Sequence, residues 1–277
     1  MQDLNNLLFT LIIYTGSFSA GLLGSLTGLG GGVIVVPMLT VLFGVDIHFA
    51  AGASLISVIA TSSGAASAYV KEGFTNIRIG MFLEIATTIG AIIGATLVGI
   101  ISVNIVSVIF AVILLYSAVV TFIKKDQNII YKPNPIAEKL KLNGNYPAGN
   151  KIVSYNVQKV PQGFIMMIFA GLLSGLLGIG SGAAKVMAMD QIMKIPFKVS
   201  TTTSNFMIGV TAAASAGIYL KNGYIQASLV MPVMLGVLTG AFLGAKLLTF
   251  TSSKSLKIVF SIIILIMAYE MLKNGLK

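Results

Sequence analysis

The chain contains no cysteine, and His48 is its only histidine. These absences exclude disulfides, thiolate catalysis, thiolate metal sites and any histidine-rich metal or haem site. Charged residues are also scarce, at 9% of the 277 residues, whereas soluble domains usually carry about 25%. Because 56% of the residues are hydrophobic, the sequence predicts an all-α protein that crosses a membrane several times.

The charges that are present give a net charge of +10. Such a balance is also typical of proteins that bind nucleic acid, but a membrane protein gathers basic residues in its cytoplasmic loops. We therefore expect a lipid bilayer and no nucleic acid as a partner. The N-terminus has no basic region before its long apolar run, so we expect this run to be retained as the first helix.

Ten apolar segments follow one another along the chain. Most approach the ~20 residues that cross ~30 Å of hydrocarbon, but the second and the seventh are too short to cross comfortably. The segments are Leu7–Thr27, Val33–Gly44, Ala50–Val70, Ile79–Ile101, Ile105–Ile123, Gly163–Leu177, Ala183–Ile195, Val199–Leu220, Ala227–Thr249 and Ser255–Leu272.

A polar stretch, Lys124–Gln162, separates the fifth segment from the sixth and contains four prolines. Its lack of periodicity predicts a linker with one short amphipathic helix near Ile136–Leu142. The sequence thus divides into a first transmembrane repeat at 1–123, a cytoplasmic linker at 124–162 and a second transmembrane repeat at 163–277.

The two halves match at a fixed offset of 150 residues. Gly28-Leu29-Gly30-Gly31-Gly32 aligns with Gly178-Ile179-Gly180-Ser181-Gly182, and Lys71 aligns with Lys221. The register holds without a gap over roughly a hundred residues, so we interpret the halves as homologous products of a duplication.

The orientation of the halves depends on whether the two short segments cross the membrane. If they cross, the fold is a 5+5 inverted repeat; if they are re-entrant, it is a 4+4 parallel one. Three pairs of equivalent loops differ in charge: Lys194 and Lys198 face Asp46-Ile47-His48, Lys71 and Arg78 face Lys221, and Lys254 and Lys257 face Asn104 and Ser107. Inverted halves place the more basic member of each pair inside, so we favour the 5+5 arrangement with paired glycine-broken helices and both termini outside.

A glycine cluster precedes each short segment and interrupts an apolar run. Glycine is costly in a helix, and irregular backbone survives at membrane depth only where it packs in protein or faces an aqueous cavity. Two such breaks at matching places point to the substrate site of a transporter. The backbone N–H groups at Gly30, Gly31, Gly180 and Ser181 are suited to the oxygens of an anion.

Lys185 lies one turn after the second glycine cluster. A lysine at membrane depth is costly unless it is paired or reaches water, so we interpret it as the positive charge that attracts an anionic substrate. The alternatives are a structural pair with Asp190 and snorkelling to an interface. Asp190 could itself pair with Lys194 at i+4.

Six polar residues open the segment that follows Pro196. Capping a helix requires only one of them, so we expect some to line a cavity. We assign to the substrate site the residues Thr201, Thr202, Thr203, Ser204 and Asn205, together with Ser54, which matches Ser204 in the first half.

Glu84, inside the fourth segment, and Asp190 are candidates for carrying a coupled proton. Glu84 could instead lie near an interface or bond to Thr87 or Thr88. No acid–base constellation accompanies the many hydroxyl groups, so we expect no enzymatic activity and no cofactor.

These residues give the chain a resemblance to a known family. The two glycine turns, Pro37 and the stretch Pro196–Asn205 resemble the TauE/SafE sulfite exporter family, also called the toluene sulfonate uptake permease family. The resemblance covers Phe18–Phe122 and Phe164–Leu272 and implies a prokaryotic inner-membrane transporter of sulfur-containing anions. The chain departs from the family pattern at Met187, where proline is usual, and at Ala53, where threonine is frequent.

We therefore expect a secondary transporter that exports a small anion, such as sulfite, sulfoacetate or another organosulfonate, by alternating access. Its expected location is the inner (plasma) membrane, with the linker in the cytoplasm. An anion channel on the same scaffold and a non-transporting membrane assembly partner are the alternatives. The sequence leaves open which anion is moved, in which direction, with which coupling ion and in which oligomeric state.

Overall fold

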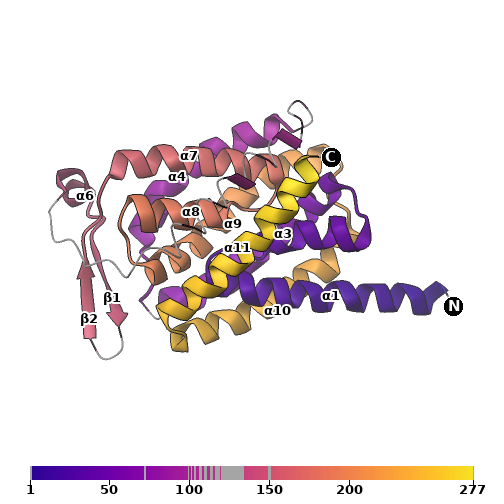
Figure 1. Ribbon diagram of the computed structural model, residues 1–277, viewed down its shortest axis with the longest axis horizontal. Helices are drawn as coiled ribbons and strands as arrows, with labels where there is room; N and C mark the ends of the chain where they lie inside the picture. The colour runs from indigo at the N-terminus through magenta and orange to yellow at the C-terminus, as the bar shows by residue number, and fades with distance from the viewer. Residues whose placement is uncertain are drawn as a thin grey trace.

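The computed structural model describes residues 2–71, 73–98, 134–148 and 151–276, and the single positions 100, 102, 104, 105, 108, 111, 112, 115 and 119. Over these residues the chain is almost entirely helical, as predicted (Figure 1). The predicted segment Ile105–Ile123 lies largely outside the described residues, as do residues 124–133 and 149–150 of the predicted linker.

The two halves contain the same series of helices. The first half has α1 (Gln2–Thr27), α2 (Gly32–Pro37), the π-helical turn η1 (Met38–Leu42), α3 (Ile47–Lys71) and α4 (Ile77–Thr96). The second has α7 (Val160–Leu177), α8 (Gly182–Met187), the π-helical turn η2 (Ala188–Ile192), α9 (Phe197–Lys221), α10 (Ala227–Phe250) and α11 (Ser253–Gly275). The starts of α2, η1 and α3, at 32, 38 and 47, recur at 182, 188 and 197 as α8, η2 and α9, so the offset of 150 holds for the structure as well.

Two close helix pairs join the halves. Glycines let α1 approach α10, and α4 approach α7, until backbone touches backbone; an added Cβ on Gly240 would lie 2.0 Å from the carbonyl oxygen of Phe18. Both pairs run parallel, because residue numbers rise together along each contact. The contacts that define these directions are Gly236 with Tyr14, Gly240 with Phe18, Gly90 with Ile168, and Gly94 with Leu172.

The equivalent helices α3 and α9, in contrast, run antiparallel. Ser62 lies against Gly209, whereas Gly52, earlier in α3, lies against Tyr224, just beyond the end of α9. The start of α3 also meets Tyr224 through His48, whose ring stacks on the tyrosine at 4.9 Å between centroids.

The remaining contacts fix two groups of helix directions. α3 runs with α10, and α4 runs with α9, so α1, α3 and α10 point one way and α4, α7 and α9 the other. Because α1 and α3 point the same way, α2 and η1 return the chain between them. The contacts that define the last two pairs are Gly52 with Ile225, Gly64 with Leu238, Asn76 with Thr203, and Glu84 with Thr211.

Five helices within the described residues are long and apolar enough to cross a membrane, namely those over Leu8–Thr27, Ile47–Gly64, Ile77–Thr96, Val160–Leu177 and Ala227–Leu248. Large apolar side chains are exposed on the outward faces of α1, α4, α7 and α10. On α4, Met81, Ile85 and Ile89 are exposed, while Glu84 and Thr87 on the opposite side are buried. An apolar outer face around a polar interior is typical of a helical membrane protein.

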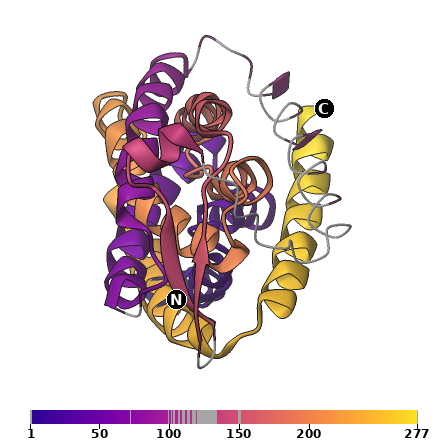
Figure 2. The ribbon, with the colours of Figure 1, turned by 90° about the vertical axis from the view of Figure 1, so that its left-hand side faces the viewer.

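A small module, here called the linker module, lies at the end of the molecule where α7 begins (Figures 1 and 2). It consists of α6 (Pro135–Lys139) and an antiparallel hairpin of β1 (Gly144–Ala148) and β2 (Lys151–Tyr155). The short helix lies close to the predicted Ile136–Leu142. The hairpin was not predicted, because Pro147 within β1 argues against a strand; both strands are edges, where proline is tolerated.

Candidate functional site

Each half carries a left-handed turn between its first long helix and the short helix that follows. Positive φ angles occur at Gly28, Gly30, Gly31, Gly178, Gly180 and Ser181. Ser181 occupies the position of Gly31, with a φ of 49°, which residues other than glycine rarely adopt. The predicted helix breaks are therefore real, and one of them holds a side chain in a strained backbone conformation.

The backbones of the two turns are in direct contact. A Cβ atom on Gly182 would lie 2.4 Å from the carbonyl oxygen of Gly28, and one on Gly32 would lie 3.2 Å from that of Ile179. Backbone therefore fills the space between the turns in this conformation. An anion held between them would require the turns to separate.

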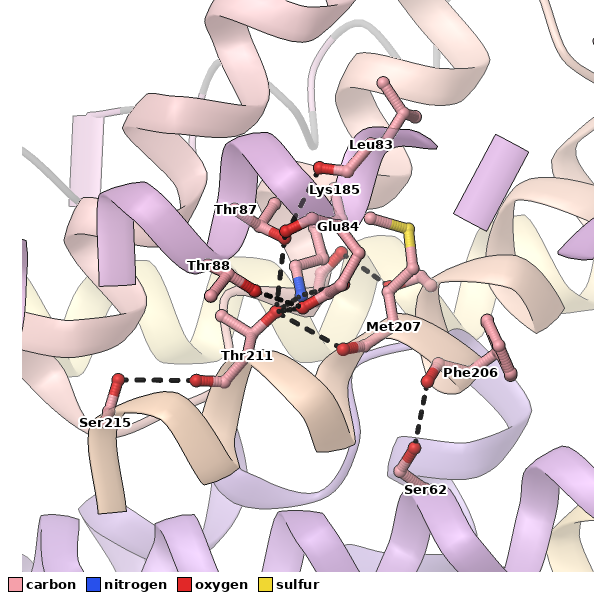
Figure 3. A network of polar contacts seen from close by, with 12 residues as sticks. Ser62, Leu83, Glu84, Thr87, Thr88, Lys185, Phe206, Met207, Thr211 and Ser215 are labelled. Atoms are coloured by element: carbon pink, nitrogen blue, oxygen red, sulfur yellow. Dashed lines mark hydrogen bonds and ion pairs between the residues drawn. The ribbon is translucent and has the colours of Figure 1, made fainter. Parts of the chain in front are cut away.

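Lys185 projects from α8 and is fully buried, with 0% of its surface exposed. Its Nζ donates to the Thr211 hydroxyl of α9 at 2.5 Å and lies 4.0 Å from Oε2 of Glu84 on α4 (Figure 3). The Thr211 hydroxyl in turn donates to Oε1 of Glu84 at 2.6 Å. The structure thus pairs Lys185 with Glu84, across the two halves, and not with Asp190, which belongs to η2.

Glu84 is 8% exposed and lies buried among the helices, and the predicted alternative of a position near the membrane interface stays a prediction. The other alternative is confirmed in part, because Thr88 donates to its Oε1 at 3.3 Å. Within the described residues, Oε2 has no hydrogen-bond partner. The buried site holds one ammonium and one carboxylate, so its charges cancel, and neither charge could stay buried alone without a penalty of several kcal/mol.

Thr211 is the residue that sequence reasoning missed. Its hydroxyl joins Lys185 to Glu84 and lies 3.3 Å from the hydroxyl of Thr87. The available signal was its repetition: Thr61 occupies the same position in the first half and is also buried. The long-range pairing itself has no counterpart in the sequence pattern.

The polar run that opens α9 is buried throughout. Ser200 and Thr201 donate to carbonyl groups at the start of their own helix, those of Ile195 and Lys198. Thr202 donates to the Phe74 carbonyl at 3.0 Å, and Thr203 accepts from the Asn76 amide at 3.1 Å. These residues therefore tie α9 to the turn between α3 and α4.

The last two members of the run contact the glycine turns. Ser204 donates to the carbonyl oxygens of Gly28, at 2.9 Å, and Gly182, at 3.4 Å, so that one hydroxyl contacts both turns. Asn205 donates to the carbonyl of Ser25 at 2.7 Å. The run thus holds the two breaks together in this conformation.

Several buried polar atoms of the helices have no hydrogen-bond partner in the described part of the chain, and one of them, Glu84 Oε2, lies 4.0 Å from Lys185 Nζ. Buried polar groups are normally paired, so each such atom is a place where an oxygen or a donor of a ligand or water could bind. They are Ser54 Oγ, Glu84 Oε2, Ser174 Oγ, Ser181 Oγ and Asn205 Oδ1.

The predicted contacts at Gly30 and Gly180 have apolar surroundings. Added Cβ atoms there would meet Ile208, at 3.0 and 2.8 Å, and Val58, at 3.7 and 3.1 Å. Val58 and Ile208 are themselves equivalent at the offset of 150, so an equivalent pair of side chains contacts both turns. The structure brings Lys185, Glu84 and Thr211 together as one polar cluster, whereas Gly30 and Gly180 lie on an apolar seam.

The chain matches the family described as "Sulfite exporter TauE/SafE" over residues 13–271. It is 26% identical to the "Probable membrane transporter protein YunE" of Bacillus subtilis, covering 97% of this chain and 98% of the relative. It is 28% identical to YdhB of the same organism, covering 85% and 89%, and 26% identical to MJ0441 of Methanocaldococcus jannaschii, covering 96% of each. Both are also named probable membrane transporter proteins, and no solved structure matches significantly.

Proposed function

Because the chain belongs to the TauE/SafE sulfite exporter family, we propose that it is a secondary transporter that exports a small sulfur-containing anion. The candidates are sulfite, sulfoacetate and other organosulfonates. The names of its relatives support membrane transport and leave the substrate unspecified. The observation that carries the proposal is the buried Lys185, placed between the halves beside a broken helix.

Lys185 supplies the charge that attracts the anion. The unpartnered hydroxyls of Ser181 and Ser54 and the nearby hydroxyls of Thr201–Ser204 are the further proposed contacts, together with Asn205. Backbone amides at Gly31 and Gly180 would join them once the two turns separate, whereas the Gly30 amide, which donates to the Gly24 carbonyl at 3.2 Å, would first have to be released from it. Such separation is the rearrangement that alternating access requires of a site between two repeats.

Glu84 is the group that would take up a proton when the anion binds. The empty site is neutral, so a monoanion would add an uncompensated negative charge at membrane depth. Uptake of one proton by Glu84 restores neutrality and frees Lys185 for the anion. We infer coupling to one proton per monovalent anion; Asp190 in η2 is the second candidate for the coupled proton.

The topology proposed is the 5+5 inverted repeat. The antiparallel course of α3 and α9 supports it, as does the shared direction of α1 and α3, which makes α2 and η1 a crossing segment. The loops support it also. Phe74 lies with Lys198 at one end of α3, and its equivalent Tyr224 lies with His48 at the other. The more basic member of each pair of equivalent loops then lies on the same side of the membrane as the linker module. We assign this side to the cytoplasm of a plasma-membrane protein.

The experiment is anion flux into proteoliposomes, with wild type, Lys185→Met and Lys221→Met compared. Lys221 is exposed at the end of α9, so its variant is the matched control. We expect saturable flux of sulfite or a sulfonate in wild type and Lys221→Met, and none in Lys185→Met. Equal flux in Lys185→Met would remove Lys185 from the site.

The panel of anions separates the substrate from the function. Sulfite, sulfoacetate, taurine, sulfate, phosphate and chloride are compared at matched ionic strength. A substrate at a hundredfold excess over its dissociation constant should also stabilise the folded protein by about 2.7 kcal/mol. Flux of none of the sulfur anions would withdraw the substrate assignment, and conductance far above a transporter's turnover would favour a channel.

A further inference from the structure

A polar pocket of about 270 Å³ lies between the linker module and the turn that joins α3 to α4. It is separate in composition from the cluster around Lys185 and shares no residue with it. The residues that line it are Phe74, Thr75, Asn76, Ile77, Arg78, Lys141, Asn143, Asn145 and Tyr155. Both the transmembrane half and the linker therefore contribute to its walls.

The charge of this cavity is positive. Arg78 comes from the first turn of α4 and Lys141 from the residues after α6, and no lining residue is acidic. Neither cation has an ion-pair partner among the residues that the structure describes. The positive end of the α4 dipole adds to their field.

The neutral groups of the cavity are hydrogen-bond donors that need an acceptor. Asn143 uses its Oδ1 to accept from the Val157 amide at 2.9 Å, which leaves its N–H groups to donate. The Tyr155 hydroxyl accepts from Asn76 at 2.9 Å, and burial raises the pKa of Tyr155 to about 12, so its proton is kept for donation. The Thr75 hydroxyl oxygen is buried without any partner in the described chain.

From these groups we propose that the cavity is a binding site for a small oxyanion of the phosphate or sulfate class. Two cations and three hydrogen-bond donors in the lining complement an anion that accepts several hydrogen bonds. The cavity volume of about 270 Å³ leaves room for one small oxyanion together with its bound water. The proposal does not depend on Lys185 or on the identity of the transported substrate.

Two residues that line the cavity, Phe74 and Asn76, also contact the polar run that opens α9. The Phe74 carbonyl accepts from Thr202, the Asn76 amide donates to Thr203, and Lys198 lies 4.5 Å above the Phe74 ring. An oxyanion that fixes Arg78 and Lys141 therefore fixes the α3–α4 turn against the start of α9. Occupancy of the cavity should slow the separation of α9 from this turn, which makes the site regulatory.

The test uses the full-length protein in the Lys185→Met background, which removes the proposed transport site. Binding of inorganic phosphate and of sulfate is measured by calorimetry, against chloride at matched ionic strength. We expect binding that weakens at least about tenfold when Arg78→Gln and Lys141→Gln are added, because each removes a charged hydrogen bond. Lys139→Gln, an exposed lysine of α6 that does not line the cavity, should bind as the background does.

Equal affinity with and without Arg78→Gln and Lys141→Gln would overturn the proposal, as would the absence of oxyanion binding in the background. Arg78 and Lys141 are both exposed, so the variant that carries Arg78→Gln and Lys141→Gln should fold. Lys141→Glu alone provides a second test, in which the charge is reversed. A sulfite arm identifies the source of the ligand: tighter sulfite binding indicates feedback by the transported class, and tighter phosphate binding a separate signal. Amide exchange at 200–205 should slow on phosphate addition, and unchanged exchange would overturn the regulatory part.

Discussion

Lys185 and Glu84 come from opposite halves of the chain, and their Nζ and Oε2 atoms lie 4.0 Å apart in a buried site. The hydroxyl of Thr211 accepts from the first and donates to the second, so the three residues form one hydrogen-bonded unit. An ammonium and a carboxylate at this depth each depend on the other for neutralisation. The unit therefore holds the halves together when the site is empty, and a bound anion would have to replace Glu84 as the partner of Lys185.

Replacing Lys185 by Met should lower the stability of the empty protein by about 3 kcal/mol, because Glu84 is left buried without its counter-ion. The double variant Lys185→Met/Glu84→Gln should recover most of this loss, since no charge remains. Thermal unfolding of the detergent-solubilised variants at pH 7 measures both. If the double variant is no more stable than Lys185→Met, the two side chains do not neutralise each other.

Replacing Glu84 by Gln should uncouple protons from the anion. Glutamine imitates the protonated carboxyl, so the variant should bind the anion without taking up a proton. A pH-sensitive dye inside proteoliposomes should record substrate-driven proton movement with wild type and none with Glu84→Gln. Proton movement equal to that of wild type would assign the coupling to another group, with Asp190→Asn as the next variant.

Replacing Thr211 by Val removes the hydroxyl between the two charges while keeping the shape of the side chain. We expect a loss of about 1–3 kcal/mol in stability, because partners on both sides lose a charged hydrogen bond. Thr61→Val is the matched control: Thr61 is equally buried, but among the described residues its hydroxyl bonds only to the Ser57 carbonyl of its own helix. Equal effects of the two variants would contradict a special role for Thr211.

Much of the fold could be predicted because the glycine clusters mark the helix breaks and the two halves repeat each other. The clusters at Gly28–Gly32 and Gly178–Gly182 have no stable place inside a lipid-facing helix, so they marked the breaks, and the fixed offset transferred each boundary from one half to the other. The family resemblance rested on the same residues and is confirmed by the match over residues 13–271.

The partner of Lys185 could not be predicted in the same way. Neither Lys185 nor Glu84 has a charged counterpart in the other half, where Val35 and Met234 stand, so the repeat carries no information about the pair. The contact between Lys185 and Glu84 depends on the packing of α4 alongside α9, and this tertiary packing has no signal in the sequence pattern. The Ser200–Asn205 run was singled out correctly as unusual, but whether it contacts substrate stays a prediction, because in this conformation most of its groups bond to backbone.

Ser181 offers a test of strain at the proposed site. Its φ of 49° should cost about 1 kcal/mol relative to glycine, so Ser181→Gly should raise the melting temperature while weakening anion binding through loss of the hydroxyl. The reciprocal change, Gly31→Ser, should lower it, because an added Cβ would lie 3.2 Å from the Ala20 carbonyl. Stabilisation by both changes, or by neither, would contradict strain as the cause.

The absence of cysteine makes the topology directly testable. Gly73 and Gly223 are equivalent at the offset of 150, share a φ of 75°, and have nothing within 4 Å of an added Cβ. Gly73→Cys and Gly223→Cys should therefore be equally strained and equally accessible to solvent. With inverted halves, a membrane-impermeant maleimide should label Gly223→Cys on intact cells and Gly73→Cys only after permeabilisation. Parallel halves would place both on one side and label them alike, and labelling of Gly73→Cys alone from outside would reverse the assignment of the linker module to the cytoplasm.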